Sequence, residues 1–331
     1  MPDFPWPPGA ATGVGSLPGT DIAEALRFVF GELPDFPHLP ELPDRGPGAD
    51  VVGRTAGLLV DLPVQLYVGR WQAAPRPGKD MRRTADLLER DLDALTEVGD
   101  GYAGTFKIQA AGPWTLAAGI DLPIGGRLLR DAGAVRDLTG SLAEGLRRHV
   151  AEVQKRLPRA SILLQLDEPS LPAVMAGRVP TESGLSAYRA VAGPEAADAL
   201  RTVVDATGVP VAVHCCAADV PLQVVRDAGA AAVALDLALV EDLDPLGEAL
   251  EAGLGLFAGA APTRPSNSQA PSSKAIAERV RTLWTRLGFP AERLPRQVVV
   301  TPACGLAGAP DQYVRTVLAA CREAGRRLAE V

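Results

Sequence analysis

The sequence predicts an α/β fold, a single (β/α)8 barrel of the TIM type, from three observations. Short apolar runs alternate along the 331 residues with longer segments of helical periodicity, which is the pattern of βα units around a parallel sheet. Eight such runs occur, the number that closes a barrel. The chain lacks the Gly-rich fingerprint of an open dinucleotide-binding sheet. We therefore expect one barrel domain over residues 1–331.

The expected strands and helices alternate along the chain. The strands are predicted at residues 11–16, 38–42, 105–110, 162–167, 209–216, 231–236, 254–259 and 298–304. The helices are predicted at residues 21–30, 80–97, 136–156, 195–207, 222–228, 246–252, 274–287 and 312–328.

Four segments fall outside this alternation. Residues 57–71 carry two apolar runs about Pro63 and predict a small hairpin inserted after the second strand. Residues 1–10 are rich in proline, and we expect them to form a flexible N-terminal arm. Residues 34–47 and 262–273 are rich in proline and polar residues and predict long loops, the second of which is a candidate mobile lid.

Composition and charge exclude several classes of function. The sequence is 47% hydrophobic and 22% charged, which is ordinary for a globular protein with a sizeable core. A net charge of -7 offers no basic surface to nucleic acid or to an anionic membrane. The N-terminus lacks the pattern of a secretory signal, and no apolar stretch is long enough to span a bilayer. We therefore expect a cytoplasmic protein whose four cysteines are thiols or metal ligands.

A histidine and two cysteines at strand ends predict a zinc site. His214 and Cys216 lie on the same face of a strand because side chains alternate, whereas Cys215 points the other way. Cys304 ends the last predicted strand, at the same face of the barrel, where barrel enzymes hold their active sites. Imidazole and thiolate ligands suit zinc, and the alternative is a buried histidine beside small apolar cysteines. Cys321 lies in a helical run and is expected in the core.

Other polar residues at strand ends are candidate binding groups. Asp236 lies in an apolar strand, so its carboxylate needs a metal, a substrate ammonium, a salt bridge or a helix cap as partner. Asp167 and Glu168 are adjacent and should face opposite sides of their strand, so one of them faces the barrel mouth. The Gly-rich segment with Gly15 would bring backbone N–H groups close to a ligand. Trp114 is a candidate either for stacking on a flat ligand or for packing at the rim.

The segments TGVGSLPGT, AAGPWT, LQLDEP, HCC and TPACGL together resemble the catalytic, C-terminal domain of cobalamin-independent methionine synthase, in the superfamily that includes uroporphyrinogen decarboxylase. The resemblance spans roughly residues 12–328. It implies a zinc ion held by His214, Cys216 and Cys304, with Asp236 in the place of the family's glutamate. The homocysteine-binding residues implied by the resemblance are Gly15, Ser16, Glu41 and Asp167, with the two carboxylates as the catalytic acids.

The function implied by the resemblance is zinc-dependent transfer of a methyl group to the thiol of homocysteine, which forms methionine. Full-length members carry an additional N-terminal barrel that helps bind polyglutamylated folate, and this sequence has none. The implied methyl donor is therefore methyltetrahydrofolate or a methylcorrinoid carried by another protein. Three alternatives remain: a different thiol acceptor, a lyase of the uroporphyrinogen decarboxylase type, and a non-catalytic zinc-binding barrel.

Overall fold

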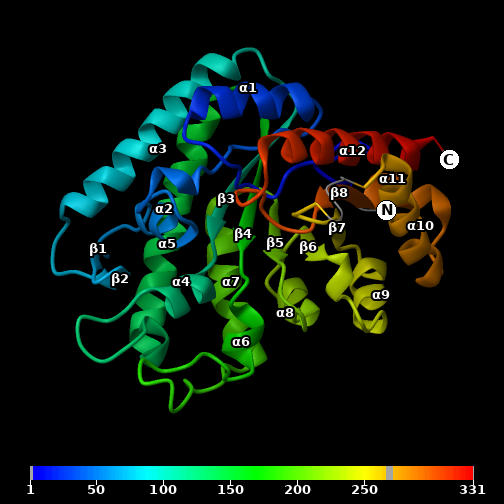
Figure 1. The fold of residues 1–331 in the computed structure, drawn as a ribbon. Helices are drawn as coiled ribbons and strands as arrows, with labels where there is room; N and C mark the ends of the chain where they lie inside the picture. Colours follow the sequence, from blue (N-terminus) through cyan, green and yellow to red (C-terminus); the bar gives the residue numbers. More distant parts are fainter. Residues whose placement is uncertain (1–2, 266–270, 331) are drawn as a thin grey trace.

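The computed structural model describes residues 3–265 and 271–330, and its centre is a curled parallel sheet (Figure 1). The strand order follows the chain from β3 to β8, and each strand pairs with the next in parallel. These strands are apolar and almost entirely buried, as expected of a parallel sheet covered by helices. Their bounds are β3 (Thr105–Ala111), β4 (Ser161–Asp167), β5 (Val211–Cys215), β6 (Ala232–Asp236), β7 (Gly255–Ala261) and β8 (Val298–Pro302).

The parallel sheet has six regular strands among the described residues, where the sequence predicted eight. The first two predicted strands, 11–16 and 38–42, form isolated parallel bridges instead. Ala11 bridges Val300 of β8, and His38 bridges Lys107 of β3, so each edge of the sheet is joined to one of these segments. Prolines 37, 40 and 43 explain the difference for residues 38–42, because proline has no N–H to donate to a continuous ladder; residues 11–16 contain no proline.

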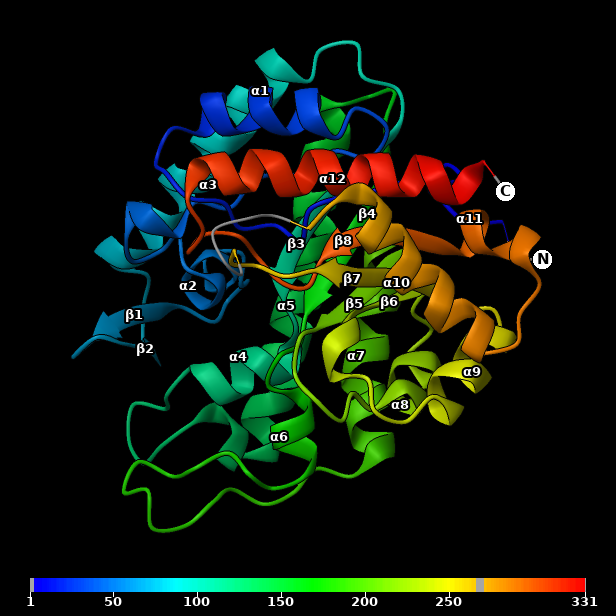
Figure 2. The same cartoon turned by 45° about the vertical axis from the view of Figure 1, so that its right-hand side comes forward.

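Helices surround the sheet, and the long ones follow the predicted segments (Figure 2). Helix α5 packs against α7, α10 packs against α12, and α1 packs against α3. Asp131 caps the first turn of α5 by accepting hydrogen bonds from Gly133 N and Ala134 N, so this helix begins four residues before the predicted start at 136. The helices that match predicted segments are α1 (Ile22–Glu32), α3 (Lys79–Val98), α5 (Ala132–Arg156), α7 (Gly193–Thr207), α8 (Leu222–Asp227), α9 (Asp244–Glu251), α10 (Ser273–Arg286) and α12 (Asp311–Ala329).

Several short helices were not predicted. They are too short for the helical periodicity of apolar residues to stand out from a loop. Four are α-helical: α2 (Val51–Ala56), α4 (Pro113–Gly119), α6 (Leu171–Met175) and α11 (Leu294–Gln297). Four are 3-10 turns: η1 (Pro43–Arg45), η2 (Leu128–Arg130), η3 (Leu237–Leu239) and η4 (Ala291–Arg293).

The N-terminal residues 3–10 are packed, although the sequence suggested a flexible arm. The ring of Trp6 stacks on Phe4 and meets Phe257 edge to face, and only 4% of Trp6 is exposed. Its indole N–H donates to the carbonyl of Arg296, and Thr105 donates to the carbonyl of Pro5. The physical reason is the apolar area of the two aromatic rings, which is buried against the end of the sheet.

Part of the candidate lid lies outside the described residues. The described residues contain no candidate membrane span. Residues 266–270 of the 262–273 loop lie outside the described residues. Within 3–265 and 271–330, no helix has both the length and the hydropathy required to cross a bilayer.

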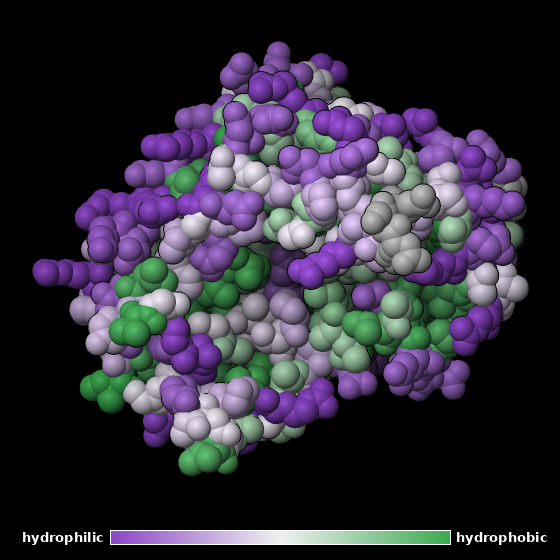
Figure 3. Space-filling model, viewed as in Figure 1, coloured by the Kyte–Doolittle hydropathy of each residue, from purple (hydrophilic) through white to green (hydrophobic). Residues whose placement is uncertain are grey.

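The predicted hairpin is present but displaced toward the C-terminus. Strands β1 (Val64–Tyr67) and β2 (Arg70–Ala73) pair antiparallel, and the apolar run before Pro63 is outside them. Val68 and Gly69 form the turn with φ of 47° and 77°. Positive φ is strained for a β-branched residue, and Val68 is also 83% exposed. Figure 3 shows apolar side chains scattered among polar ones on the side of the molecule where Figure 1 labels β1 and β2.

Val68→Asn should therefore stabilise the fold. The Asn-Gly pair is favoured in this two-residue turn, and removal of the strain is worth roughly 1 kcal/mol. Urea unfolding should show a higher midpoint with an unchanged slope. Val68→Thr is the matched control, because it adds polarity but keeps the branched Cβ. An equal gain in Val68→Thr would show that the effect comes from polarity and not from backbone strain.

Candidate metal centre

His214, Cys216 and Cys304 form the cluster that could hold a metal ion. One nitrogen of His214 and both sulfurs lie within 4.8 Å of one another. Among the described residues, this is the group of three His, Cys, Asp or Glu side chains that are close enough together to hold a metal ion. His214 lies on β5, Cys216 follows that strand, and Cys304 follows β8 by two residues. All three lie at the carboxyl ends of parallel strands, as the sequence predicted.

The curl of the sheet creates this cluster. In the strand order, β6 and β7 separate β5 from β8. With neighbouring strands about 4.8 Å apart, a flat sheet would hold the ends of β5 and β8 roughly 14 Å apart. The Sγ atoms of Cys216 and Cys304 are 3.0 Å apart. The two thiols therefore meet only because the sheet bends round on itself.

The imidazole of His214 is oriented for metal binding through Nε2. Its Nδ1 lies 2.8 Å from Oδ1 of Asp167, whereas Nε2 is buried and has no hydrogen-bond partner among the described residues. Metal-bound histidines commonly donate the other ring N–H to a carboxylate in this way, which fixes the tautomer and the ring orientation. A buried nitrogen without a partner is costly, and Nε2 is therefore the ring nitrogen that could bind a metal ion.

The two clustered thiols are chemically distinct from the other cysteines. The hydrogen bond with Cys216 and the neighbouring His214 lower the pKa of Cys304 to about 5, which favours the thiolate that a metal binds. The same hydrogen bond raises the pKa of Cys216. Cys215 points into the core, and Cys321 is buried in α12; burial raises the pKa of each to about 12.

Asp236 is not brought to the cluster. It ends β6, and the chain turns immediately into η3, so its Oδ1 accepts a hydrogen bond from Ala238 N at 2.9 Å. The carboxylate is thus a helix cap, one of the partners that the sequence left open. An aspartate side chain is also one methylene shorter than the glutamate that the resemblance implied at this place.

Asp167 and Glu168 face opposite sides, as alternation predicted. Asp167 points to His214. Glu168 is fully buried and accepts hydrogen bonds from Trp114 N at 2.9 Å and from the N–H and hydroxyl of Thr115 at 2.8 and 2.7 Å. Burial raises the pKa of Glu168 to about 7. Glu168 therefore anchors the start of α4, while Asp167 serves the cluster.

The Gly-Ser turn and Glu41 lie beside the cluster. Ser16 bridges Glu41, and Glu41 N donates to the carbonyl of Gly15 at 3.1 Å. The carbonyl of Ser16 accepts from Leu306 N at 2.8 Å, and a Cβ on Gly305 would collide with the Ser16 hydroxyl. The turn is therefore packed directly against the segment that carries Cys304.

Glu41 is buried and belongs to an ion-pair network that the sequence did not reveal. Its Oε1 lies 3.6 Å from Nε of Arg54, which also pairs with Asp91 at 2.6 Å. Asp91 is fully buried and receives two further bonds from Arg45, at 2.6 and 3.0 Å. Burial raises the pKa of Glu41 to about 7, against the opposing effect of Arg54. The sequence feature that could have indicated this network is Asp91, an acidic residue on the buried face of α3.

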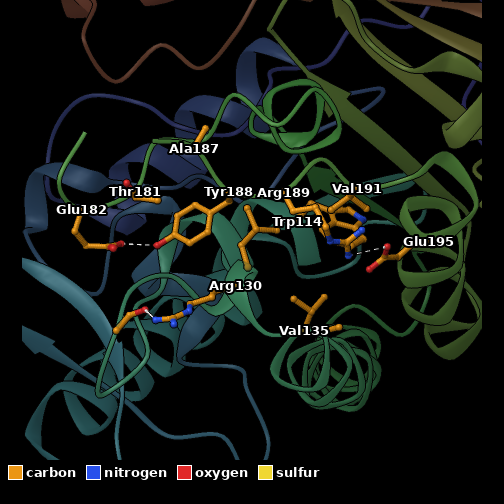
Figure 4. Close-up of a pocket in the computed structure, with 13 residues that line it drawn as sticks. Trp114, Arg130, Val135, Thr181, Glu182, Ala187, Tyr188, Arg189, Val191 and Glu195 are labelled. Atoms are coloured by element: carbon orange, nitrogen blue, oxygen red, sulfur yellow. Dashed lines mark hydrogen bonds and ion pairs between the residues drawn. The ribbon is translucent and has the colours of Figure 1, made fainter. Parts of the chain in front are cut away.

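Trp114 lies away from the cluster. Its indole N–H donates to the carbonyl of Ala196 at 3.0 Å, and the ring lines a pocket of about 450 Å³ (Figure 4). In this pocket the Tyr188 hydroxyl donates to Glu182 at 2.6 Å. None of the residues that line it belongs to the metal cluster. The structure thus places Trp114 in packing and in this separate pocket.

Two buried polar side chains on strands of the curled sheet were also missed. Lys107 on β3 donates to the carbonyl of Val14 at 2.8 Å and to Gln109 at 3.0 Å. Gln165 on β4 donates to the same Val14 carbonyl at 2.9 Å and to Asp167 at 2.7 Å. Polar residues at alternate positions of otherwise apolar strands were the signal, since Gln165 and Asp167 share a face.

Comparisons with known proteins place the fold of this chain among known families and structures. Residues 9–327 match the family described as the cobalamin-independent synthase catalytic domain. The chain is similar to a B12-independent methionine synthase from Shewanella sp. W3-18-1 in complex with selenomethionine, with a TM-score of 0.65, 11% identity and 98% of both chains covered. It is also similar to a methyltransferase from Methanosarcina mazei, with a TM-score of 0.57, 14% identity and coverage of 98% of this chain and 94% of that one.

No curated protein matches the chain. At 11% and 14% identity the two structural likenesses establish the fold alone. The family match is the stronger finding, because it spans residues 9–327 and includes every member of the cluster. This protein therefore belongs to the cobalamin-independent synthase catalytic-domain family.

Proposed function

We propose that this protein is a zinc-dependent methyltransferase that methylates the thiol of homocysteine to form methionine. The observation that carries the proposal is the cluster of His214, Cys216 and Cys304, in which a buried Nε2 without a partner faces two cysteine sulfurs. Three ligands of this kind suit a catalytic zinc, which keeps a fourth position for a substrate. A purely structural zinc site would have four protein ligands.

Zinc bound here would lower the pKa of a coordinated thiol and leave a nucleophilic sulfur. A free thiol, with a pKa of about 8.5, is mostly protonated at neutral pH and is a poor nucleophile. The protein's part is to hold the ligands in place. Asp167 fixes the ring of His214 through Nδ1, and the curl of the sheet that contains β5 and β8 sets the 3.0 Å approach of the two sulfurs. The cluster is half-buried at its cysteines, so a small thiol has access.

The amino-acid part of homocysteine would bind next to the cluster. Glu41 and Asp167 offer carboxylates for its ammonium group. Glu41 is bridged to Ser16 of the Gly-Ser turn, and Asp167 contacts His214 of the cluster. The turn at Gly15 and Ser16 offers backbone groups to its carboxylate. Holding the amino-acid group through these contacts would orient the sulfur for in-line attack on the methyl donor, either methyltetrahydrofolate or a methylcorrinoid.

The metal centre is tested by zinc content. Purified wild-type protein should hold one zinc per chain, and Cys304→Ser should lower zinc affinity by at least tenfold because it removes a thiolate ligand. Cys215→Ala is the matched control, since Cys215 neighbours the cluster but faces the core, and it should keep its zinc. Metal-free wild-type protein, or full zinc in Cys304→Ser, would contradict the metal centre.

The acceptor is tested on cobalt-substituted protein. Homocysteine should change the cobalt–thiolate absorption, whereas a coenzyme thiol without the amino-acid group should not, because Glu41 and Asp167 recognise the ammonium. A response to the coenzyme thiol alone would assign a different acceptor and leave the metal centre intact. Turnover with methyltetrahydrofolate compared with methylcobalamin then identifies the donor.

The role of Glu41 predicts a pH dependence of methionine binding. Methionine carries the ammonium group but no thiol, so its affinity isolates this contact. Only the ionised carboxylate attracts the ammonium, and the pKa of Glu41 is about 7. Affinity should therefore rise with pH, and roughly a tenth of the carboxyl is ionised at pH 6, which weakens binding about tenfold relative to pH 8. In Glu41→Gln, calorimetry should show weak binding without this dependence; an unchanged pH profile would remove Glu41 from the site.

A further inference from the structure

We propose that Gln165 is a positioning residue that couples the Gly-Ser turn to the metal centre. It does so by holding Asp167 in the orientation that directs His214 toward the metal. The inference rests on the metal centre of the proposed function and assigns a role to a side chain outside the ligand set. Gln165 is 1% exposed and does not touch the metal cluster directly.

The hydrogen bonds of Gln165 form a continuous path. Its amide nitrogen donates to the carbonyl of Val14 at 2.9 Å and to Oδ1 of Asp167 at 2.7 Å. The same Oδ1 lies 2.8 Å from Nδ1 of His214. The path therefore runs from the residue that precedes Gly15, through one amide group and one carboxylate oxygen, to the imidazole whose Nε2 is free for a ligand.

The chemistry of the amide explains why glutamine suits this position. An NH2 group has two donors, and both are used, one on a neutral carbonyl and one on a carboxylate. Hydrogen bonds to a carboxylate are about twice as strong as neutral ones, so this contact fixes the rotamer of Asp167. A fixed Oδ1 requires Nδ1 of His214 to carry the proton. Nε2, the other ring nitrogen, is thereby kept as the lone-pair donor for a metal.

The Val14 carbonyl is held from two sides. Lys107 donates to it from β3, and Gln165 donates to it from β4, the neighbouring strand. Both donors are buried in the barrel interior. A carbonyl held by two strands gives the Gly-Ser turn a defined position relative to the sheet. Because one of its two donors also holds Asp167, a displacement of the turn changes the hydrogen bonding of the metal's histidine.

Loss of the two donors should weaken zinc binding even though no ligand is changed. In Gln165→Met, which keeps the length of the side chain, zinc affinity measured by chelator competition should fall 10- to 100-fold, the usual effect of removing a contact that orients a metal-bound histidine. Gln297→Met is the matched control. Gln297 is 2% exposed, and its amide donates to two backbone carbonyls, those of Leu250 and Leu254, and not to Asp167; zinc affinity should change by less than about twofold in this variant.

A double-mutant cycle shows whether Gln165 acts through Asp167. In the Asp167→Asn background, Gln165→Met should change zinc affinity by less than about threefold, because the oxygen that it orients has already lost its charge. In metal-free protein labelled with 15N-histidine, Gln165→Met should also lose the slowly exchanging Nδ1–H signal of His214. Gln165→Glu, of equal size, is the second variant if the methionine variant fails to fold, and it should weaken zinc binding to the same extent.

The outcomes separate this inference from the proposed function. Wild-type protein that binds no zinc would overturn the metal centre itself. Tight zinc binding by wild-type protein with equal affinity in Gln165→Met or Gln165→Glu would overturn only the role of Gln165. A full loss of affinity in the Asp167→Asn background would show that Gln165 acts by another route, which also contradicts the inference.

Discussion

The curl of the parallel sheet is the constraint on which the rest of this structure depends. His214 and Cys216 come from β5 and Cys304 from β8, and two strands separate them in the sheet. Each strand alone presents an incomplete ligand set. Bending the sheet brings the carboxyl ends of the strands into one small volume, and the two sulfurs come within 3.0 Å. The bend is supported at both edges by the bridged segments that contain Ala11 and His38.

Charged side chains are buried near the candidate substrate site, and those of Glu41, Arg54 and Asp91 are paired with one another. Asp91 is compensated by Arg45 and Arg54, and Arg54 extends the same network to Glu41. Burying an ion without such partners would cost several kcal/mol, so these pairs are a condition for placing Glu41 beside the turn. On the other side of the turn, Lys107 and Gln165 hold the Val14 carbonyl. The candidate substrate site is thus positioned by Arg54 on α2, Lys107 on β3 and Gln165 on β4.

The differences between the expected and observed structure have local causes. The predicted strand at residues 38–42 is replaced by bridges because prolines 37, 40 and 43 interrupt the ladder. Asp236 caps η3 and does not approach the cluster, because the chain turns directly after β6. Trp114 packs against α7, since α4 begins at Pro113 and turns the indole toward Ala196. For Asp236 and Trp114, the direction of the chain after the strand end decided which residues they contact.

The sequence by itself determined the βα alternation, the pairing of His214 with Cys216 on one strand face, and the placement of Cys304 at a strand end. These follow from local periodicity and from the two-residue repeat of a strand. Only the tertiary structure decided that Asp167 holds His214 while Asp236 does not reach the cluster, and that Gln165 lies between Asp167 and Val14. The contacts of Asp167 with His214 and of Gln165 with Val14 join residues far apart in the chain, so they depend on how strands curl and pack, which no local pattern encodes.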